Sequence, residues 1–289
     1  MTRRTTPQSV ALETTLLAHG VPAGVAPALH EQLARIITDT GAHPALVGVL
    51  DGEPVVGMTP EELAVLLATE DLPKLNTANL GLALARKQSG ATTVSTTMEL
   101  AAAAGVGVFA TGGIGGVHRG YGEHLDVSSD LLALARFPVA VVASGVKSIL
   151  DVESTREAIE TLGVPVVGYQ TDAFPAFYRQ ASGAGVDARF DDVEELAAYC
   201  RAETNRTGRG VLVCNPVPEA DELPEAEWNG WLKKAMKKAL SAGATGRGVT
   251  PAVLAALHEL SGGRTLTSNI ALVKSNAELA GRLAVAGAR

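Results

Sequence analysis

Two short apolar runs, VGVFA (106–110) and PVAVVAS (138–144), constrain the fold of this chain more than any other feature. Strands that are apolar on both sides are typical of parallel sheets buried between two layers of helices. Along the chain, about seven strand-like runs alternate with about nine segments of helical periodicity, without an internal repeat. This order predicts one α/β domain over residues 1–289, with three α/β/α layers.

A hairpin signal makes the predicted sheet mixed. The strand ALVGVL (45–50) and the run PVVG (54–57) are joined by Asp51-Gly52, a dipeptide typical of tight hairpin turns. The next segment, which begins Thr59-Pro60, has the residues of a helix capping box. Aromatic residues make up only 4% of the chain, so the core must consist of Ala, Val and Leu. We therefore expect a mixed, mostly parallel central sheet packed closely against its helices.

Charge and composition argue against two classes of partner. The formal net charge of −7 disfavours non-specific binding to nucleic acid, which requires neutralisation of phosphates. No run of about 18 apolar residues exists, so no membrane span is expected. The basic helical run at 227–240 could lie on a membrane surface, but an apolar stripe that faces the core is favoured.

The start of the chain and its cysteines indicate a compartment. The first residues are not followed by an apolar segment of signal-peptide length. The spacing of Cys200 and Cys214 matches no metal motif, and both are expected to stay reduced. A cytoplasmic protein is therefore predicted.

Five glycines lie within residues 112–120, directly after the strand predicted at 106–110. The run lacks the Lys-Ser/Thr pair of a Walker A loop, and His118 replaces the third glycine of the dinucleotide fingerprint. Glycines after a strand nevertheless let backbone N–H groups approach an anion, and His118 and Arg119 add positive charge. The alternative is a plain tight turn.

An acidic cluster follows the glycines. Asp126 and Asp130 are separated by four positions, with Ser128 and Ser129 between them. Such carboxylates can hold a hard cation together with water. Alternatively, one of the serines caps a helix predicted at 130–136, and the N-terminus of that helix is itself an anion site.

Two ionisable side chains come at the ends of predicted strands. Glu13 follows a strand at 8–12, and Lys147 follows the strand at 138–144. Ligand sites in α/β proteins gather at the carboxyl ends of strands. Lys147 also precedes a helix predicted at 148–163, whose dipole disfavours a cation, as suits a lysine that forms a Schiff base. The alternatives are a cap or surface salt bridge for Glu13 and a solvated amine for Lys147.

Other polar residues are more ambiguous. Lys74 lies in a predicted loop and could be a surface lysine. The hydroxyl-rich run at 92–98 reads as a strand and turn that either supplies donors to a polar ligand or caps a helix at 98–105. Asn269, at the start of a helix predicted at 268–287, is either a cap or a ligand contact.

Taken together, the motifs between Phe109 and Leu150 resemble one enzyme family, the pseudouridine-5′-phosphate glycosidases. The resemblance in this stretch rests on ATGGIGGVHRG, DVSSDL and SGVKSILD. Further matching segments follow in the expected order over nearly the whole chain: ALETTLLAHG, GATTVSTTM, VPVVGYQTDAFPAFY, NPVPE, VTPAVLAALHELSGGRTL and SNIALVKSNAELA. A single glycine run is weak evidence, whereas this ordered set is specific.

The resemblance implies a reaction and roles for particular residues. Members of the family cleave the C–C bond between uracil and ribose 5-phosphate, through an imine between C1′ of the opened sugar and a lysine. By motif position, Lys147 is implied as that lysine and Glu13 as the acid that protonates uracil. A divalent metal, usually manganese, is implied on Asp126, and the family is typically homotrimeric. The implied substrate contacts are Lys74, Val94, Ser128, Ser129, Asp130, His118 at the phosphate and Asn269 at the base.

One segment departs from the family pattern. After Lys74 the chain reads LNTANLG, where many members have a Ser-Arg-Arg-Asp-type run, so two arginines are missing near a phosphate site. The departure leaves open a second function, a C-glycosynthase of specialised metabolism that couples ribose 5-phosphate to another acceptor. A phosphosugar-binding protein without catalysis is a third hypothesis. The co-occurrence of Glu13, Lys147 and Asp126 argues against it.

Overall fold

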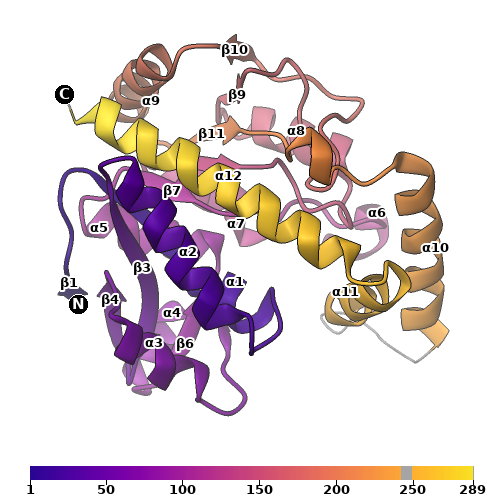
Figure 1. Ribbon diagram of the computed structural model, residues 1–289, viewed down its shortest axis with the longest axis horizontal. Coiled ribbons are helices and arrows are strands. Elements are labelled where there is room, and N and C mark those ends of the chain that lie inside the picture. The colour runs from indigo at the N-terminus through magenta and orange to yellow at the C-terminus, as the bar shows by residue number, and fades with distance from the viewer. Residues whose placement is uncertain (242–248, 289) are drawn as a thin grey trace.

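The computed structural model describes residues 1–241 and 249–288, and its centre is one 11-stranded sheet (Figure 1). The strands follow the order β1-β4-β3-β2-β7-β8-β11-β9-β10, and β6 pairs with both β3 and β5. The strand bounds are β1 Thr2–Arg3, β2 Ser9–Glu13, β3 His43–Leu50, β4 Glu53–Val56, β5 Lys74–Leu75, β6 Gly90–Thr92, β7 Val108–Ala110, β8 Ala140–Ala143, β9 Val166–Tyr169, β10 Ala188–Phe190 and β11 Val211–Cys214.

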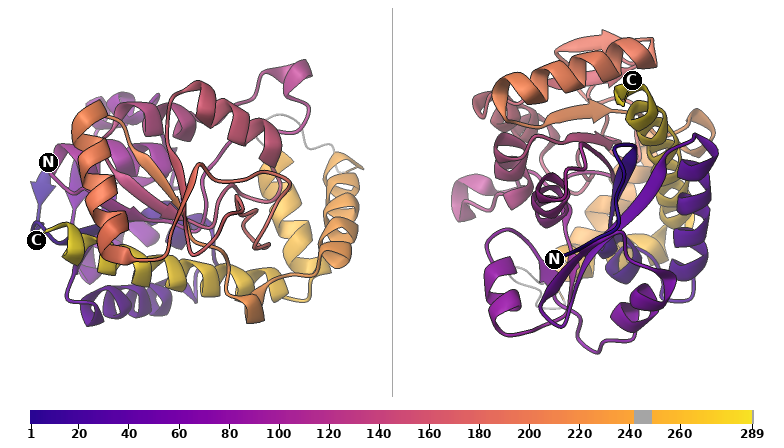
Figure 2. Two further views of the ribbon diagram at one scale, coloured as in Figure 1. Left: turned by 90° about the horizontal axis from the view of Figure 1, so that it is seen from above. Right: turned by 90° about the vertical axis from the view of Figure 1, so that its left-hand side faces the viewer.

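Helices cover both faces of this sheet. One layer consists of α2, α12 and α9, which pack side by side, and the opposite layer contains α5 and α7 (Figures 1 and 2). The helix bounds are α1 Thr14–His19, α2 Ala26–Asp39, α3 Pro60–Leu67, α4 Leu80–Ala85, α5 Val94–Ala103, α6 Tyr121–His124, α7 Ser129–Arg136, α8 Val152–Thr161, α9 Val193–Thr207, α10 Glu225–Ser241, α11 Val249–Leu260 and α12 Arg264–Gly287. The three-layer prediction is confirmed.

The mixed character of the sheet is confirmed as well. β3 and β4 form the antiparallel hairpin around Asp51-Gly52, with Val47 opposite Val56. β6 is a second antiparallel neighbour of β3, which the sequence pattern did not indicate. The capping box is present, because the Thr59 side chain accepts from the N–H of Glu62 and the Glu62 side chain accepts from the N–H of Thr59.

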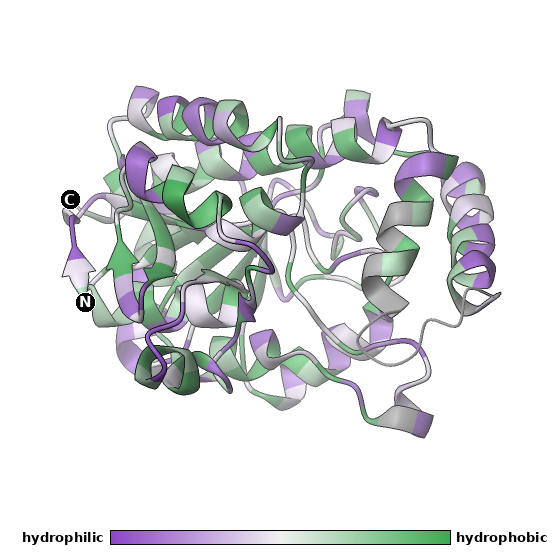
Figure 3. Ribbon diagram, turned by 90° about the horizontal axis from the view of Figure 1, so that it is seen from below, coloured by the Kyte–Doolittle hydropathy of each residue, from purple (hydrophilic) through white to green (hydrophobic). Residues whose placement is uncertain are grey.

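The core consists mostly of small aliphatic side chains, as the composition predicts. Apolar residues concentrate on the strands and on the inward sides of the helices (Figure 3). On α10, the side chains of Trp228, Leu232 and Ala235 are buried, so the apolar stripe of this basic helix faces the protein interior. Among the described residues, no helix combines the length and apolar character needed to cross a bilayer.

Three predicted boundaries are wrong. The hydroxyl-rich run at 92–98 is mainly the first turn of α5, which begins at Val94. The helix predicted from residue 148 begins only at Val152, so Lys147 does not lie at a helix N-terminus. Asn269 lies in the second turn of α12, where it cannot cap the helix.

Tertiary contacts explain the late start of α8. The segment before it is held by hydrogen bonds from the N–H of Lys147 to the carbonyl of Ile114 (3.1 Å) and from Ser148 Oγ to the carbonyl of Ala176 (2.5 Å). The side chain of Asp151 then caps the helix by accepting from the N–H of Ser154 (3.0 Å). Ile114 and Ala176 lie far from this segment in sequence, so the local pattern could not show these contacts.

The turn that precedes Lys147 requires glycine at position 145. Gly145 has φ +74°, and a Cβ there would lie 1.8 Å from the carbonyl oxygen of Pro175. Gly105 provides a matched comparison, since it has φ +76° and no heavy atom within 4 Å of the added Cβ. The two positions share the cost of the left-handed conformation but differ in the close backbone approach.

We therefore expect Gly145→Ala to destabilise the protein far more than Gly105→Ala. The conformational cost at Gly105 is on the order of 1 kcal/mol. The clash at Gly145 should add at least about 2 kcal/mol to that value. Urea unfolding monitored by circular dichroism measures both free energies of unfolding, and equal losses in the two variants would contradict the prediction.

Candidate active site

The carboxyl ends of three neighbouring parallel strands form the candidate site. β7 pairs with β2 on one side and with β8 on the other, with Leu12 opposite Ala110 and Ala110 opposite Val142. Glu13, the last residue of β2, is therefore level with Thr111, which follows β7. Lys147 comes from the turn after β8. The fold thus brings Glu13 and Lys147 to the same edge of the sheet, as the sequence predicted.

Glu13 is a buried acid that faces two lysines. Its side chain is almost fully enclosed, and Oε1 accepts a hydrogen bond from Thr111 Oγ1 at 2.5 Å. Burial raises the pKa of Glu13 above its ordinary value. The charge of Lys147, the hydrogen bond from Thr111 and the charge of Lys74 lower this pKa, whereas the charge of Asp130 raises it. The net direction is upward, which favours the protonated form.

Lys74 approaches Glu13 and Lys147 from a different part of the sheet. It lies on the two-residue strand β5 rather than in a loop, because β5 pairs with β6. The residue keeps exposed surface, yet surrounding protein groups are close enough to affect its amine. Burial and the like charge of Lys147 lower the pKa of Lys74, and Glu13 raises it. One acid and two amines therefore interact electrostatically at this edge.

Asp130 connects three segments around the site. Its Oδ1 accepts from the N–H of Ser95 at 3.0 Å, and its Oδ2 accepts from the N–H of Gly115 at 2.8 Å. The side chain of Ser128 caps α7 by accepting from the N–H of Asp130, and Ser129 Oγ lies 3.1 Å from Ser95 Oγ. Asp130 thus joins the N-termini of α5 and α7 to the glycine run. Its predicted contact with substrate stays a prediction, as do those of Ser128 and Ser129.

The glycine run is packed tightly against protein groups. A Cβ on Gly115 would meet Ser128 Oγ at 2.3 Å, and a Cβ on Gly116 would meet Thr155 Oγ1 at 2.4 Å. Several N–H groups of the run already have protein acceptors: those of Ile114, Gly115, Val117 and His118. These glycines permit close packing, and the N–H groups named here are not free to bind an anion.

His118 and Asp126 face each other at the two ends of the segment that contains α6. The N–H of His118 donates to the carbonyl of Asp126 at 3.0 Å, and the His118 Nδ1 to Asp126 Oδ2 distance is 3.7 Å. The Asp126 side chain is 57% exposed. Within the described residues, no group of three or more His, Cys, Asp or Glu side chains converges on a common point. A divalent ion on Asp126 would therefore depend mainly on water and substrate oxygens, an arrangement that suits Mg²⁺-like ions.

Val94 and Asn269 offer backbone and amide groups. Val94 is the first residue of α5, where backbone N–H groups lack partners within the helix. Asn269 Nδ2 donates to the carbonyl of Gly20 at 3.5 Å. Its Oδ1 is buried and has no hydrogen-bond partner among the described residues. A buried acceptor without a partner fits a ligand N–H group.

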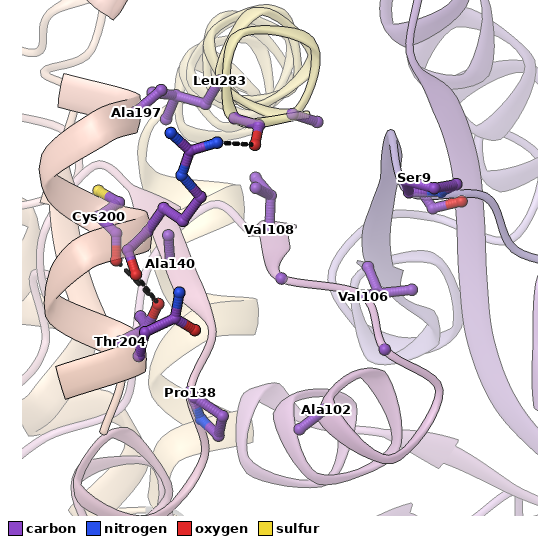
Figure 4. A pocket seen from close by; sticks show the side chains of 17 residues that line it. Ser9, Ala102, Val106, Val108, Pro138, Ala140, Ala197, Cys200, Thr204 and Leu283 are labelled. Atoms are coloured by element: carbon purple, nitrogen blue, oxygen red, sulfur yellow. Dashed lines mark hydrogen bonds between the residues drawn. The ribbon is translucent and has the colours of Figure 1, made fainter. Parts of the chain in front are cut away.

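Two hollows differ in their relation to this site. A hollow of about 290 Å³ lies at the amino ends of β7 and β8, on the opposite edge of the sheet, lined by Val106, Val108 and Ala140 (Figure 4). Its arginine, Arg201, donates to the carbonyl of Gly287. The other hollow, of about 500 Å³, is lined by residues of α1 that include His19. Burial, and then the charge of Lys74, lower the pKa of His19. Glu13, Lys74 and Lys147 are not among the residues that line this hollow.

Sequence reasoning missed Thr111, Ser95 and Asn276. Thr111 is the first polar residue after β7, which is the same signal that singled out Glu13 after β2. Asn276 had no such signal, because a polar residue in a long helix is usually solvated. Here it is fully buried.

A buried acid and two lysines lie at the carboxyl ends of a mostly parallel sheet, which is where α/β enzymes place their ligand sites. Residues 3–286 match the family described as indigoidine synthase A like protein, and the chain belongs to this family. It is 49% identical to a pseudouridine-5′-phosphate glycosidase of Methylobacterium nodulans over 97% of this chain and 84% of that protein. A protein of the same name from a Nocardioides strain is 45% identical over 95% of this chain and 90% of its own length.

Two solved structures are similar over almost the whole fold. An indigoidine synthase A-like protein from Thermotoga maritima superposes with a TM-score of 0.91 at 37% identity, covering 100% of this chain and 96% of that one. The prealnumycin C-glycosynthase AlnA, in complex with ribulose 5-phosphate, superposes with a TM-score of 0.89 at 36% identity, covering 97% and 91% of the two chains. The resemblance inferred from the sequence is confirmed.

The two hydrogen bonds of Asp130 generate a stability prediction. In Asp130→Asn, one acceptor oxygen becomes an NH₂ group that faces a backbone N–H donor, so one buried bond is lost. We expect the free energy of unfolding to fall by about 1–3 kcal/mol. Asp192→Asn is the control, since Asp192 is an exposed N-cap of α9 and asparagine caps equally well, within about 0.5 kcal/mol. Equal stabilities of the two variants in urea unfolding would contradict the prediction.

Proposed function

We propose that this protein reversibly cleaves the C–C glycosidic bond of pseudouridine 5′-phosphate to uracil and ribose 5-phosphate. The observation that carries the proposal is the convergence of the buried acid Glu13 with Lys147 and Lys74 at one strand edge. Relatives at 44–49% identity are named pseudouridine-5′-phosphate glycosidases and cover nearly the whole chain, which supports the same activity here.

Lys147 and Glu13 have complementary roles in the proposed reaction. The Lys147 amine bonds to C1′ as the C1′–O4′ bond breaks and the ribose ring opens, and the proton that the nitrogen loses goes to O4′. Glu13 then gives its proton to C5 of uracil while the C1′–C5 bond breaks, and the nitrogen lone pair forms a protonated imine with C1′. Water hydrolyses the imine, which releases ribose 5-phosphate and restores the amine. Burial favours the protonated form of Glu13 before this step.

The surrounding residues are proposed to bind the substrate. Lys74 supplies positive charge, and the backbone at Val94 and the side chains of Ser128 and Ser129 are proposed to contact the substrate. Asp130 holds the N-termini of α5 and α7 together. His118 is proposed at the phosphate, and Asn269 presents its unpartnered oxygen to an N–H of the base.

A divalent ion, proposed to be Mn²⁺, would be held by Asp126 and would neutralise substrate oxygens. Because Asp126 is the one carboxylate that we assign to it, the ion should bind weakly without substrate. Titration of Mn²⁺ by electron paramagnetic resonance with wild type and Asp126→Asn tests this assignment independently of turnover. We further propose a homotrimer, on the basis of the family resemblance, and a cytoplasmic location, on the basis of the two unpaired cysteines.

Variants of the two lysines test the imine. Lys147→Ala should abolish release of uracil, because no amine remains to bond C1′. Lys74→Ala should instead raise KM for the phosphorylated substrate. Borohydride reduction in the presence of ribose 5-phosphate, followed by peptide mass spectrometry, should place the adduct on Lys147. An adduct on Lys74 would exchange the two roles, and the absence of any adduct would favour a phosphosugar-binding protein without catalysis.

The raised pKa of Glu13 predicts how the activity depends on pH. Glu13 must be protonated to give its proton, and its pKa is raised, mainly by burial. The activity that depends on protonated Glu13 is therefore present below that raised pKa and is lost as the pH rises through it. Glu13→Gln should lower kcat at least about 100-fold and remove this limb of the profile. A wild-type profile without a falling limb at high pH, or a falling limb that Glu13→Gln retains, would contradict this role of Glu13.

The likeness to a C-glycosynthase supports a second candidate function, coupling of ribose 5-phosphate to another acceptor. In that direction Lys147 would form the same imine, and Glu13 would take up the proton that the acceptor carbon loses. Release of uracil from pseudouridine 5′-phosphate, followed by absorbance, supports the glycosidase. Failure to release uracil, together with a trapped ribose 5-phosphate adduct, would support the synthase.

A further inference from the structure

Thr111 holds the acid from the neighbouring strand. Its side chain is 1% exposed, and its hydroxyl donates to Oε1 of Glu13 at 2.5 Å. Its own N–H donates to the carbonyl of Val142 at 3.0 Å, which continues the pairing of β7 with β8 beyond the end of the strand. Because Oε1 accepts from Thr111, the transferable proton of Glu13 is left to Oε2.

Asn276 holds the backbone of Thr111 from the helical layer that contains α2, α12 and α9. This residue of α12 is fully buried, and its Nδ2 donates to the carbonyl of Thr111 at 2.8 Å and to Ser144 Oγ at 3.1 Å. Its Oδ1 accepts from Asn215 Nδ2 at 2.9 Å. One amide group thereby connects the segments that follow β7, β8 and β11. Ser144 precedes Lys147 by three residues, so both reactive segments share this anchor.

We propose that Thr111 is a positioning residue of the reaction, which orients the carboxyl group of Glu13 through its hydroxyl while Asn276 holds Thr111 in place. The proposal rests on the proposed function in one respect, namely that Glu13 is the acid. Thr111 itself touches no reacting atom in this assignment.

The hydrogen bond also has a defined electrostatic effect. The charged groups that act on Glu13 are Lys147 from the turn after β8, Lys74 from β5 and Asp130 from α7. A hydrogen bond donated to a carboxylate stabilises its ionised form, so the bond from Thr111 lowers the pKa of Glu13 against the larger effect of burial. Removal of the hydroxyl should therefore raise this pKa and extend activity to higher pH.

Two substitutions separate positioning from packing. Thr111→Val keeps the shape of the side chain but removes the donor, and Thr111→Ser restores it. We expect Thr111→Val to lower kcat roughly 10- to 100-fold with little change in KM. The falling limb of the pH–activity profile of Thr111→Val should move to higher pH. The kcat of Thr111→Ser should stay within about threefold of the wild-type value. Thr97→Val is the control, because Thr97 is also buried and its hydroxyl donates to Thr92 Oγ1 rather than to Glu13.

A measurement without substrate distinguishes this proposal from the proposed function. The carbonyl stretch of protonated Glu13, assigned by infrared difference against Glu13→Gln, is titrated in wild type, Thr111→Val and Thr97→Val. A higher pKa in Thr111→Val alone supports the positioning role, even if wild type releases no uracil. An unchanged titration in Thr111→Val, or equal losses of kcat in Thr111→Val and Thr111→Ser, would overturn the proposal.

Discussion

The site depends on the parallel pairing of β2, β7 and β8. Their register places the end of β2 beside the end of β7, and the end of β7 beside that of β8, so the residues that follow each strand come to one level. Parallel strands with apolar side chains on both faces require two covering layers, which α2 and α12 and the opposite pair α5 and α7 provide. The site is thus a consequence of how the sheet is buried.

Burial and neighbouring charges shift the pKa values of the ionisable groups at these strand ends in opposite directions. Burial raises the pKa of Glu13, while Lys147, Thr111 and Lys74 lower it. The same burial lowers the pKa of Lys74, because desolvation disfavours whichever form is charged. A carboxyl group that retains its proton suits the protonation of carbon that we propose for Glu13. The hydrogen bond from Thr111 adds orientation to this balance.

Much of the fold could be predicted because its signals are local. The hairpin at Asp51-Gly52, the capping box at Thr59 and the apolar strands need only neighbouring residues. The interpretation of Lys147 shows the limit. Its position after β8 could be predicted, but the helix start could not, because Ile114 and Ala176 hold the intervening turn. The glycine run shows the same limit, since the side chains that crowd Gly115 and Gly116 come from α7 and α8.

The sequence by itself determined the layered α/β class, the mixed sheet and the placement of Glu13 and Lys147 after strands, because each follows from periodicity and short-range turn chemistry. The tertiary structure alone decided which N–H groups Asp130 binds, which carbonyl Asn276 holds and which oxygen of Glu13 accepts from Thr111. These contacts join residues that are 15 to 165 positions apart. Their geometry is set by the packing of whole elements, which local sequence patterns do not encode.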